Sequence, residues 1–147
     1  SEAPQKLEQV ADRSILKIYS FDKDNPLDFS WLVKAVLNDL QNGVPRSEIA
    51  SAFHRTYAAM WCVELAKQAV RQKLSRVVLC GGVFQNKLLV DILMPMLRQL
   101  GLQPYLPASV PCNDAGIAVG QMAVTAAWIE QSMNHNDKRH ARVVVGL

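Results

Sequence analysis

The sequence has few cysteines, no long apolar run and no dense cluster of like charges. Its three cysteines, Cys62, Cys80 and Cys112, are widely spaced, so they form neither a disulfide framework nor a CxxC metal pair. The uncharged stretch 115–129 is shorter than the roughly 20 apolar residues that a bilayer span needs, and no uncharged stretch of the sequence is longer. These absences exclude a disulfide-stapled protein and a transmembrane one, and we expect a soluble protein of the reducing cytoplasm with no membrane partner.

Charge is nearly balanced along the chain. Lysine and arginine (16) exceed aspartate and glutamate (13) by only three, and they are scattered rather than gathered into the stripe that a nucleic-acid backbone requires. We therefore expect no nucleic-acid partner. Half of the 147 residues are hydrophobic, which is enough for one domain with a buried core. The sequence starts at Ser1 in what reads as the middle of a helix, so we expect it to begin partway through a longer protein.

Hydrophobic periodicity predicts an α/β fold in which a helical hairpin is followed by strand, helix, strand and helix. The predicted elements are a helix over 2–12, a strand over 14–21, helices over 27–43 and 45–73, a strand over 76–80, a helix over 85–100, a strand over 103–106 and a helix over 113–131. The strand–helix–strand unit indicates a parallel pair of strands. The polar, basic residues 132–147 are predicted to be a flexible tail.

Two glycines follow the strand predicted over 76–80 and precede a helix. Gly81 and Gly82 permit positive φ and let a ligand touch backbone that a Cβ would shield. The helix start just beyond them offers unpaired N–H groups to an anion or a polar ring edge. Two interpretations stay open: a contact with a nucleotide, or a tight strand-to-helix turn in which Asn86 only caps the helix.

A second segment, 111–121, joins the last predicted strand to the last helix and carries Asn113 and Asp114. Ligands of open α/β sheets bind beyond the carboxyl ends of the strands, so Asp114 is predicted to point into the same crevice as Gly82. There it would bind a metal ion or orient a phosphate through one. The alternative is a helix cap, because a carboxylate at a helix N-terminus is stabilised by the helix dipole.

Three further features are predicted to be structural. His54, on the long helix, fits a surface or a satisfied core histidine better than a ligand. Cys62 fits the core better than a nucleophile, because no basic residue or helix start lies near enough to lower its pKa. One face of the last helix carries only small residues, on which another backbone can pack closely: Gly116, Gly120, Ala123 and Ala127.

Four segments together resemble the C-terminal part of the HypF family of hydrogenase maturation carbamoyltransferases. Residues 81–89 read Gly-Gly-Val-Phe-Gln-Asn-Lys-Leu-Leu, and residues 111–121 read Pro-Cys-Asn-Asp-Ala-Gly-Ile-Ala-Val-Gly-Gln. Residues 49–54 and 2–8 are similar to two helices that lie earlier in the family. Order and spacing agree, and the resemblance covers about residues 2–128.

This resemblance implies one lobe of an actin-like ATPase (ASKHA) domain, in which two related α/β lobes enclose a nucleotide. Residues 1–131 would form most of the second, C-terminal lobe. Gly81, Gly82 and Asn86 would lie against the nucleotide, which is ATP or a carbamoyl-adenylate. Asp114 would help to hold a divalent metal ion, magnesium, zinc or iron, whose other ligands would be histidines of the absent lobe. No nucleophile is expected from this chain.

The activity implied by the resemblance is carbamoyl transfer. Carbamoyl phosphate and ATP give a carbamoyl-adenylate, and the domain passes the carbamoyl group to the C-terminal cysteine of HypE, for the cyanide ligands of nickel–iron hydrogenase. The expected partners are therefore a HypE-type acceptor protein and the remaining domains of the same full-length chain. The piece alone is expected to be inactive, because a metal and backbone donors shared between lobes would have to fix the phosphate of the adenylate.

Two positions depart from the family's Pro-Pro-Asn-Asp-Gly-Gly pattern: Cys112 replaces a proline, and Ala115 replaces a glycine and would narrow the approach to the ligand. Two rival interpretations stay open. One is a tRNA threonylcarbamoyl transferase, which shares the lobe and a similar Gly-Gly-Val segment, although residues 83–86 and the lack of a basic stripe favour HypF. The other is a nucleotide-binding module with no catalytic part, in which Gly82 and Asp114 are only a turn residue and a cap.

Overall fold

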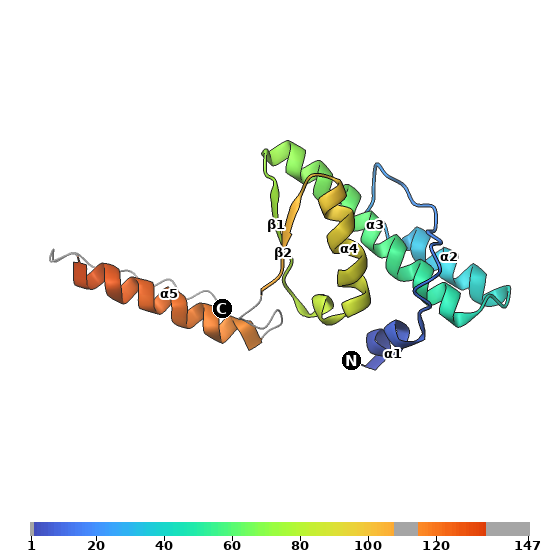
Figure 1. Ribbon diagram of the computed structural model, residues 1–147, viewed down its shortest axis with the longest axis horizontal. Coiled ribbons are helices and arrows are strands. Elements are labelled where there is room, and N and C mark those ends of the chain that lie inside the picture. The colour runs from blue at the N-terminus through green and yellow to red at the C-terminus, as the bar shows by residue number, and fades with distance from the viewer. Residues whose placement is uncertain (1, 108–114, 135–147) are drawn as a thin grey trace.

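The computed structural model describes residues 2–107 and 115–134. Its elements, shown in Figure 1, are in chain order α1 (Glu2–Val10), α2 (Ser30–Gln41), α3 (Arg46–Gln72), β1 (Arg76–Val78), the 3-10 helix η1 (Gly82–Gln85), α4 (Lys87–Gln99), β2 (Gln103–Tyr105) and α5 (Ala115–Asn134). The predicted α/β order is confirmed, with a pair of helices followed by strand, helix, strand and helix. The boundaries differ from the predicted ones by a few residues.

The 27-residue helix α3 lies at the centre, with α2 packed against it from one side and α4 from another (Figure 1). Fully buried alanines on α3, Ala50, Ala52 and Ala58, leave room for these neighbours to approach closely. One core cluster joins α3 to α4 and the strands, and includes Leu79, Leu93 and Leu97. A second cluster joins α3 to α2 and includes Leu32, Met60 and Tyr19.

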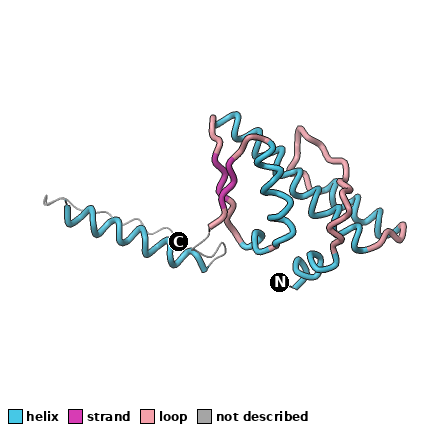
Figure 2. Tube along the Cα trace, viewed as in Figure 1, coloured by secondary structure: helices cyan, strands magenta, loops and turns pink. Residues whose placement is uncertain are grey.

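The strands β1 and β2 form a parallel two-stranded sheet, drawn in magenta in Figure 2, in which Arg76 pairs with Gln103 and Val78 with Tyr105. The pairing continues past β1, where Leu79 N donates to the Tyr105 carbonyl at 2.8 Å. Parallel strands need a crossover connection, and α4 provides it. The glycine turn therefore lies at the carboxyl end of β1, directly before α4.

The prediction of a strand over Ser14–Phe21 is wrong, because among the described residues this segment is extended but pairs with no strand. It runs along α3, whose side chains bond to its backbone. Tyr19 N donates to Thr56 Oγ1 at 2.9 Å, and Arg55 Nε donates to the Ile15 carbonyl at 2.6 Å. The β-forming residues indicate an extended backbone correctly, but they do not distinguish a neighbouring strand from helix side chains as the bonding partner.

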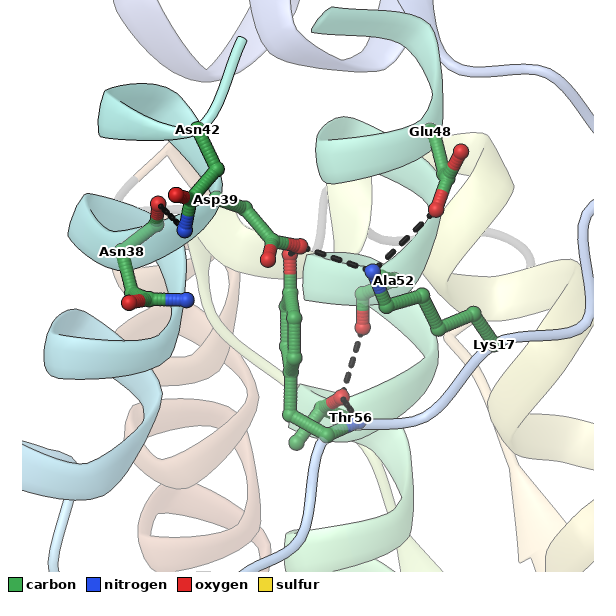
Figure 3. Close-up of polar contacts among 8 residues, drawn as sticks. Lys17, Asn38, Asp39, Asn42, Glu48, Ala52 and Thr56 are labelled. Carbon is green, nitrogen blue, oxygen red and sulfur yellow. Dashed lines mark hydrogen bonds and ion pairs between the residues drawn. The ribbon is translucent and has the colours of Figure 1, made fainter. Parts of the chain in front are cut away.

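A cluster of charged and hydroxyl groups fixes this extended segment to α2 and α3 (Figure 3). Lys17 Nζ contacts Asp39 Oδ2 at 2.8 Å and Glu48 Oε1 at 3.1 Å, and the Tyr19 hydroxyl donates to the same Asp39 oxygen at 2.8 Å. The bonds from Lys17 and then from Tyr19 lower the pKa of the Asp39 carboxyl. Burial, followed by the bond to Asp39, raises the pKa of Tyr19 to about 12.

Helix α5 is longer than predicted and its described side chains are exposed. It runs to Asn134 rather than to Gln131, so residues 132–134, which the sequence assigns to the tail, are helical. Figure 1 shows this helix lying apart from the rest of the described chain. On its small-residue face, Gly120, Ala123 and Ala127 are exposed. The exposed apolar side chains along α5 include Ile117, Met122, Val124, Trp128 and Ile129.

Candidate functional site

The turn between β1 and α4 has a backbone conformation that its glycines allow. Gly81 has φ 113° and ψ 160°, a backbone conformation that L-residues with a side chain rarely adopt. Gly82 opens η1, in which Phe84 N donates to the Gly81 carbonyl at 3.2 Å. Asn86 then caps α4, because its Oδ1 accepts from Leu89 N at 2.8 Å. Asn86 is thus a helix cap, and its contact with a nucleotide stays a prediction.

Gly82 and Asn86 line the same cavity, whose volume is about 550 Å³. Small-molecule sites span roughly 300–1,000 Å³, so the cavity has the size of a ligand site. Four parts of the chain form its wall: α1 contributes Glu8, α3 contributes His54, the turn contributes Gly82 and Asn86, and α4 contributes Leu89. Gly81 shapes the turn but is not among the lining residues. The structure thus brings together two of the three residues that the motif singles out.

The first N–H groups of α4 are already bonded, so the prediction of unpaired N–H groups at this helix start is wrong for two of them. Glu8 Oε1 accepts from Leu88 N at 2.9 Å, and Asn86 Oδ1 accepts from Leu89 N. A carboxylate at this position is stabilised by the helix dipole and ties α1 to α4. Because the Glu8 carboxylate is negative, its place in the wall suits a hydroxyl or an amine of a ligand better than a phosphate.

His54 is a satisfied core histidine, as predicted, and it also touches the candidate site. Its side chain is buried, with 3% of the residue exposed. Nδ1 lies 2.7 Å from the Ala50 carbonyl oxygen, and Nε2 lies 2.8 Å from Asn86 Nδ2. Nothing in the sequence marks this contact, because the two residues are 32 positions apart and no motif links them. The place of Glu8 at the start of α4 is likewise without a sequence signal.

A smaller, mainly apolar cavity of about 280 Å³ adjoins the first one. Tyr57, Val83 and Leu89 line both cavities, so the two share a wall. Trp61 contributes to the second cavity, and its ring meets that of Tyr57 edge to face at 6.4 Å between centroids. The site therefore offers polar groups beside aromatic side chains.

Cys62 provides no activated thiol. Cys62 is buried in the core, as predicted, and burial raises the pKa of its thiol to about 11. Such a thiol stays protonated at neutral pH, and the protonated form is a poor nucleophile. Cys80 is exposed at the end of β1. Cys112 lies outside the described residues.

Asp114 also lies outside the described residues, so its predicted place beside Gly82 stays a prediction. Across residues 2–107 and 115–134, no group of three or more histidine, cysteine, aspartate or glutamate side chains is arranged to hold a metal ion. The described residues therefore do not fit a metal site by themselves. No helix in the same ranges has the length and apolar character of a bilayer span.

Comparison with known proteins finds carbamoyltransferases and a tRNA-modification protein as relatives. Residues 1–121 match the family described as the carbamoyltransferase Kae1-like domain, second subdomain. Carbamoyltransferase HypF of Rhizobium leguminosarum bv. viciae is 38% identical over 101 residues, which are 68% of this chain and 13% of that protein. The carbamoyltransferase HypF homolog of Cupriavidus necator is 34% identical over 110 residues, 74% of this chain and 28% of that protein. A probable bifunctional tRNA threonylcarbamoyladenosine biosynthesis protein of Methanosphaera stadtmanae is 29% identical over 103 residues, 69% of this chain and 19% of that protein.

Solved structures share the fold. A crystal structure of full-length HypF in the phosphate- and nucleotide-bound form matches with a TM-score of 0.71 at 26% identity, over 88% of this chain and 18% of that chain. T. kodakarensis HypF matches with a TM-score of 0.69 at 23% identity, over 86% of this chain and 17% of that chain. The predicted fold, one lobe of an actin-like domain, is confirmed. The chain spans well under a third of the length of each of these relatives.

Proposed function

Because this chain belongs to the HypF-type carbamoyltransferase family, as the second subdomain of its Kae1-like domain, we propose that it contributes one wall of an adenine-nucleotide site. The observation that carries the proposal is that Gly82 and Asn86 line one cavity of about 550 Å³. The family motif singles out these residues by sequence alone. The fold independently gives them a shared surface of the right size for a ligand.

The chemistry of the cavity wall suits a nucleotide. A Cβ added at Gly82 would meet no atom within 4 Å, so the backbone there is open to a ligand. The Asn86 amide offers an N–H donor, and the Glu8 carboxylate can accept from ribose hydroxyls or from an amino group of the base. Tyr57 and its aromatic neighbours in the wall provide apolar contacts for a ring. Donor, acceptor and apolar surface therefore lie within one site.

The proposed reaction is transfer of a carbamoyl group from a carbamoyl-adenylate, formed from carbamoyl phosphate and ATP, to the C-terminal cysteine of a HypE-type acceptor. The cysteine sulfur loses its proton to solvent and bonds to the carbamoyl carbon, while the bond from that carbon to the phosphate oxygen breaks and AMP leaves. In this scheme the product leads to the cyanide ligands of nickel–iron hydrogenase. The relatives named carbamoyltransferase HypF support the proposal, as does the nucleotide-bound HypF structure.

This chain's part in the reaction would be binding and orientation. Donors held in place before the reaction stabilise developing charge without reorganisation, and a fixed adenylate presents its carbamoyl carbon to the incoming thiol. No nucleophile is assigned to the chain, because the sulfur comes from the acceptor protein. The acceptor and the remaining domains of a full-length chain are thus the proposed partners, in the cytoplasm.

Asp114 is the residue of this chain that we propose as a ligand of a divalent metal ion. Magnesium, zinc or iron would be held by this carboxylate together with histidines of a first lobe. Because the described residues form no metal site of their own, no step is assigned to the metal.

Two alternatives remain testable beside carbamoyl transfer to HypE. The relative from Methanosphaera stadtmanae carries a name from tRNA threonylcarbamoyladenosine biosynthesis, which makes a tRNA acceptor the second candidate. The scattered basic residues disfavour it. A nucleotide-binding module with no catalytic part is the third candidate. Assaying a HypE-type peptide and tRNA as acceptors separates the three.

The first experiment is calorimetric titration of Mg-ATP into this chain alone and into a chimera in which it replaces the matching 101 residues of the Rhizobium relative. We expect the chimera to bind and the chain alone to bind at least about tenfold more weakly, because half of the donors would be missing. Equal affinity would show that the site is complete within this chain. No binding in the chimera would remove the nucleotide proposal.

A further inference from the structure

His54 is almost wholly buried, yet it forms part of the wall of the candidate nucleotide cavity. It contacts Asn86 at 2.8 Å through Nε2 and the Ala50 carbonyl at 2.7 Å through Nδ1. Its ring also meets the Phe53 ring edge to face, with centroids 5.8 Å apart. The contacts at Nδ1, at Nε2 and with the Phe53 ring hold the imidazole in one orientation, next to the Asn86 amide.

Leu89 N, the Asn86 amide, the His54 ring and the Ala50 carbonyl form a row of hydrogen bonds. The backbone groups at the two ends of this row determine the direction of each bond. Leu89 N–H can only donate, so the Asn86 atom that it meets is Oδ1, and the atom facing His54 is Nδ2. Because Nδ2 can only donate, His54 Nε2 must accept. The imidazole proton is then on Nδ1 and is donated to the Ala50 carbonyl, which can only accept. The neutral Nδ1–H tautomer follows from these constraints.

We propose that His54 is a positioning residue of the nucleotide site. Its Nε2 lone pair holds one N–H of the Asn86 amide and leaves the other N–H for an acceptor atom of the ligand, such as a ring nitrogen or a ribose oxygen. Within the described part of the chain, that second N–H has no recorded acceptor, although Asn86 lines the cavity. The inference rests on the proposed function, and it adds that Asn86 acts there as a donor.

The same row couples the ligand contact to the start of α4. Rotating the amide to present Oδ1 to the ligand would turn Nδ2 toward Leu89 N–H, which sets two donors against each other and removes the helix cap. An Nε2–H tautomer of His54 would set two donors against each other at the Asn86 contact and two acceptors against each other at the Ala50 carbonyl. The site therefore selects for a ligand with a hydrogen-bond acceptor at this point.

Three substitutions in the chimera separate positioning from capping. His54→Phe keeps a buried ring but removes the acceptor. His54→Gln restores an acceptor through its amide oxygen. Asn86→Asp keeps the cap, since a carboxylate oxygen still accepts from Leu89 N, but removes the donor. We expect Mg-ATP affinity to fall about tenfold or more for His54→Phe and Asn86→Asp, and to stay within about threefold for His54→Gln.

Nitrogen-15 NMR of the His54 ring in the ligand-free chain checks the geometry without nucleotide. The expected signature is an Nδ1–H tautomer with an unprotonated Nε2. A proton on Nε2, or unchanged affinity in a folded His54→Phe chimera, would overturn the inference while the proposed function stands. If His54→Phe does not fold, the comparison of His54→Gln with Asn86→Asp decides, and equal loss in both would also overturn it. If the unsubstituted chimera binds no nucleotide, the proposed function itself fails and the inference fails with it.

Discussion

At the scale of single residues, substitutions of the two glycines in the β1–α4 turn are expected to affect different properties: the stability of the fold at Gly81 and the affinity for the ligand at Gly82. A Cβ at either position would meet no atom within 4 Å, but only Gly81 has a positive φ, of 113°. Gly81→Ala should therefore destabilise the fold by about 1–2 kcal/mol through backbone strain. Gly82→Ala should change the free energy of unfolding by less than about 0.5 kcal/mol, because Gly82 has neither a left-handed φ nor a neighbour that the added methyl group would strike.

The expected effect of Gly82→Ala is on the ligand. Its methyl group would project from the cavity wall, so nucleotide affinity in the chimera should fall by about tenfold. Urea denaturation and calorimetry on the same two variants measure both quantities. A folded Gly82→Ala variant with full affinity would show that the nucleotide does not approach this backbone.

The sequence predicts the part of the site whose residues lie close together in the chain, and it does not predict the part contributed by distant helices. Gly82 and Asn86 lie in one turn, so their neighbourhood is visible in the motif. His54 and Glu8 reach the same cavity from other helices. Their approach depends on how α1 and α3 pack against α4, which local periodicity does not determine. Asp114 stays a prediction.

At the scale of elements, the extended segment over Ser14–Phe21 makes the alkaline stability of the fold depend on Tyr19. The folded pKa of Tyr19 is raised to about 12 from 10.0. Its stabilising contribution is therefore complete below pH 10, where both states are protonated, and is lost as the pH rises from 10 through 12. Tyr19→Phe removes the bond to Asp39 and should cost about 1 kcal/mol at pH 8.

Urea denaturation of both forms between pH 8 and pH 11 checks this prediction. The stability difference between the two forms should shrink steadily above pH 10, because only the unsubstituted chain ionises Tyr19 on unfolding. A difference that stays constant over that range would contradict the assignment of the raised pKa to Tyr19.

The elements themselves were predicted well where a single periodicity governs them. Helices α3 and α4 have long apolar stripes, and their predicted spans differ from the observed ones by few residues. The error over Ser14–Phe21 has a physical cause: Thr56 and Arg55 bond to the backbone there, and a side chain on a distant helix leaves no trace in a local pattern.

At the scale of the whole molecule, the two core clusters of the described chain lie within α1 to β2, and α5 adds none of their members. The helix instead exposes Ile117, Met122 and Trp128 along its length. Exposed apolar side chains of this kind promote association. The sequence predicts the helix correctly, but the spacing of its small residues does not reveal which backbone covers it.

A chain that ends at residue 107 should therefore be as stable as the longer one and associate less. The expected change in the free energy of unfolding is below about 0.5 kcal/mol, since α5 contributes none of the described core residues. Sedimentation equilibrium should show a lower apparent mass per chain for the short form, because the exposed apolar side chains of α5 are gone. The matched control keeps α5 and replaces Met122 and Ile129 by glutamine. It should reproduce the reduced association at full length, whereas a large loss of stability in the short form would show that α5 packs on the core in solution.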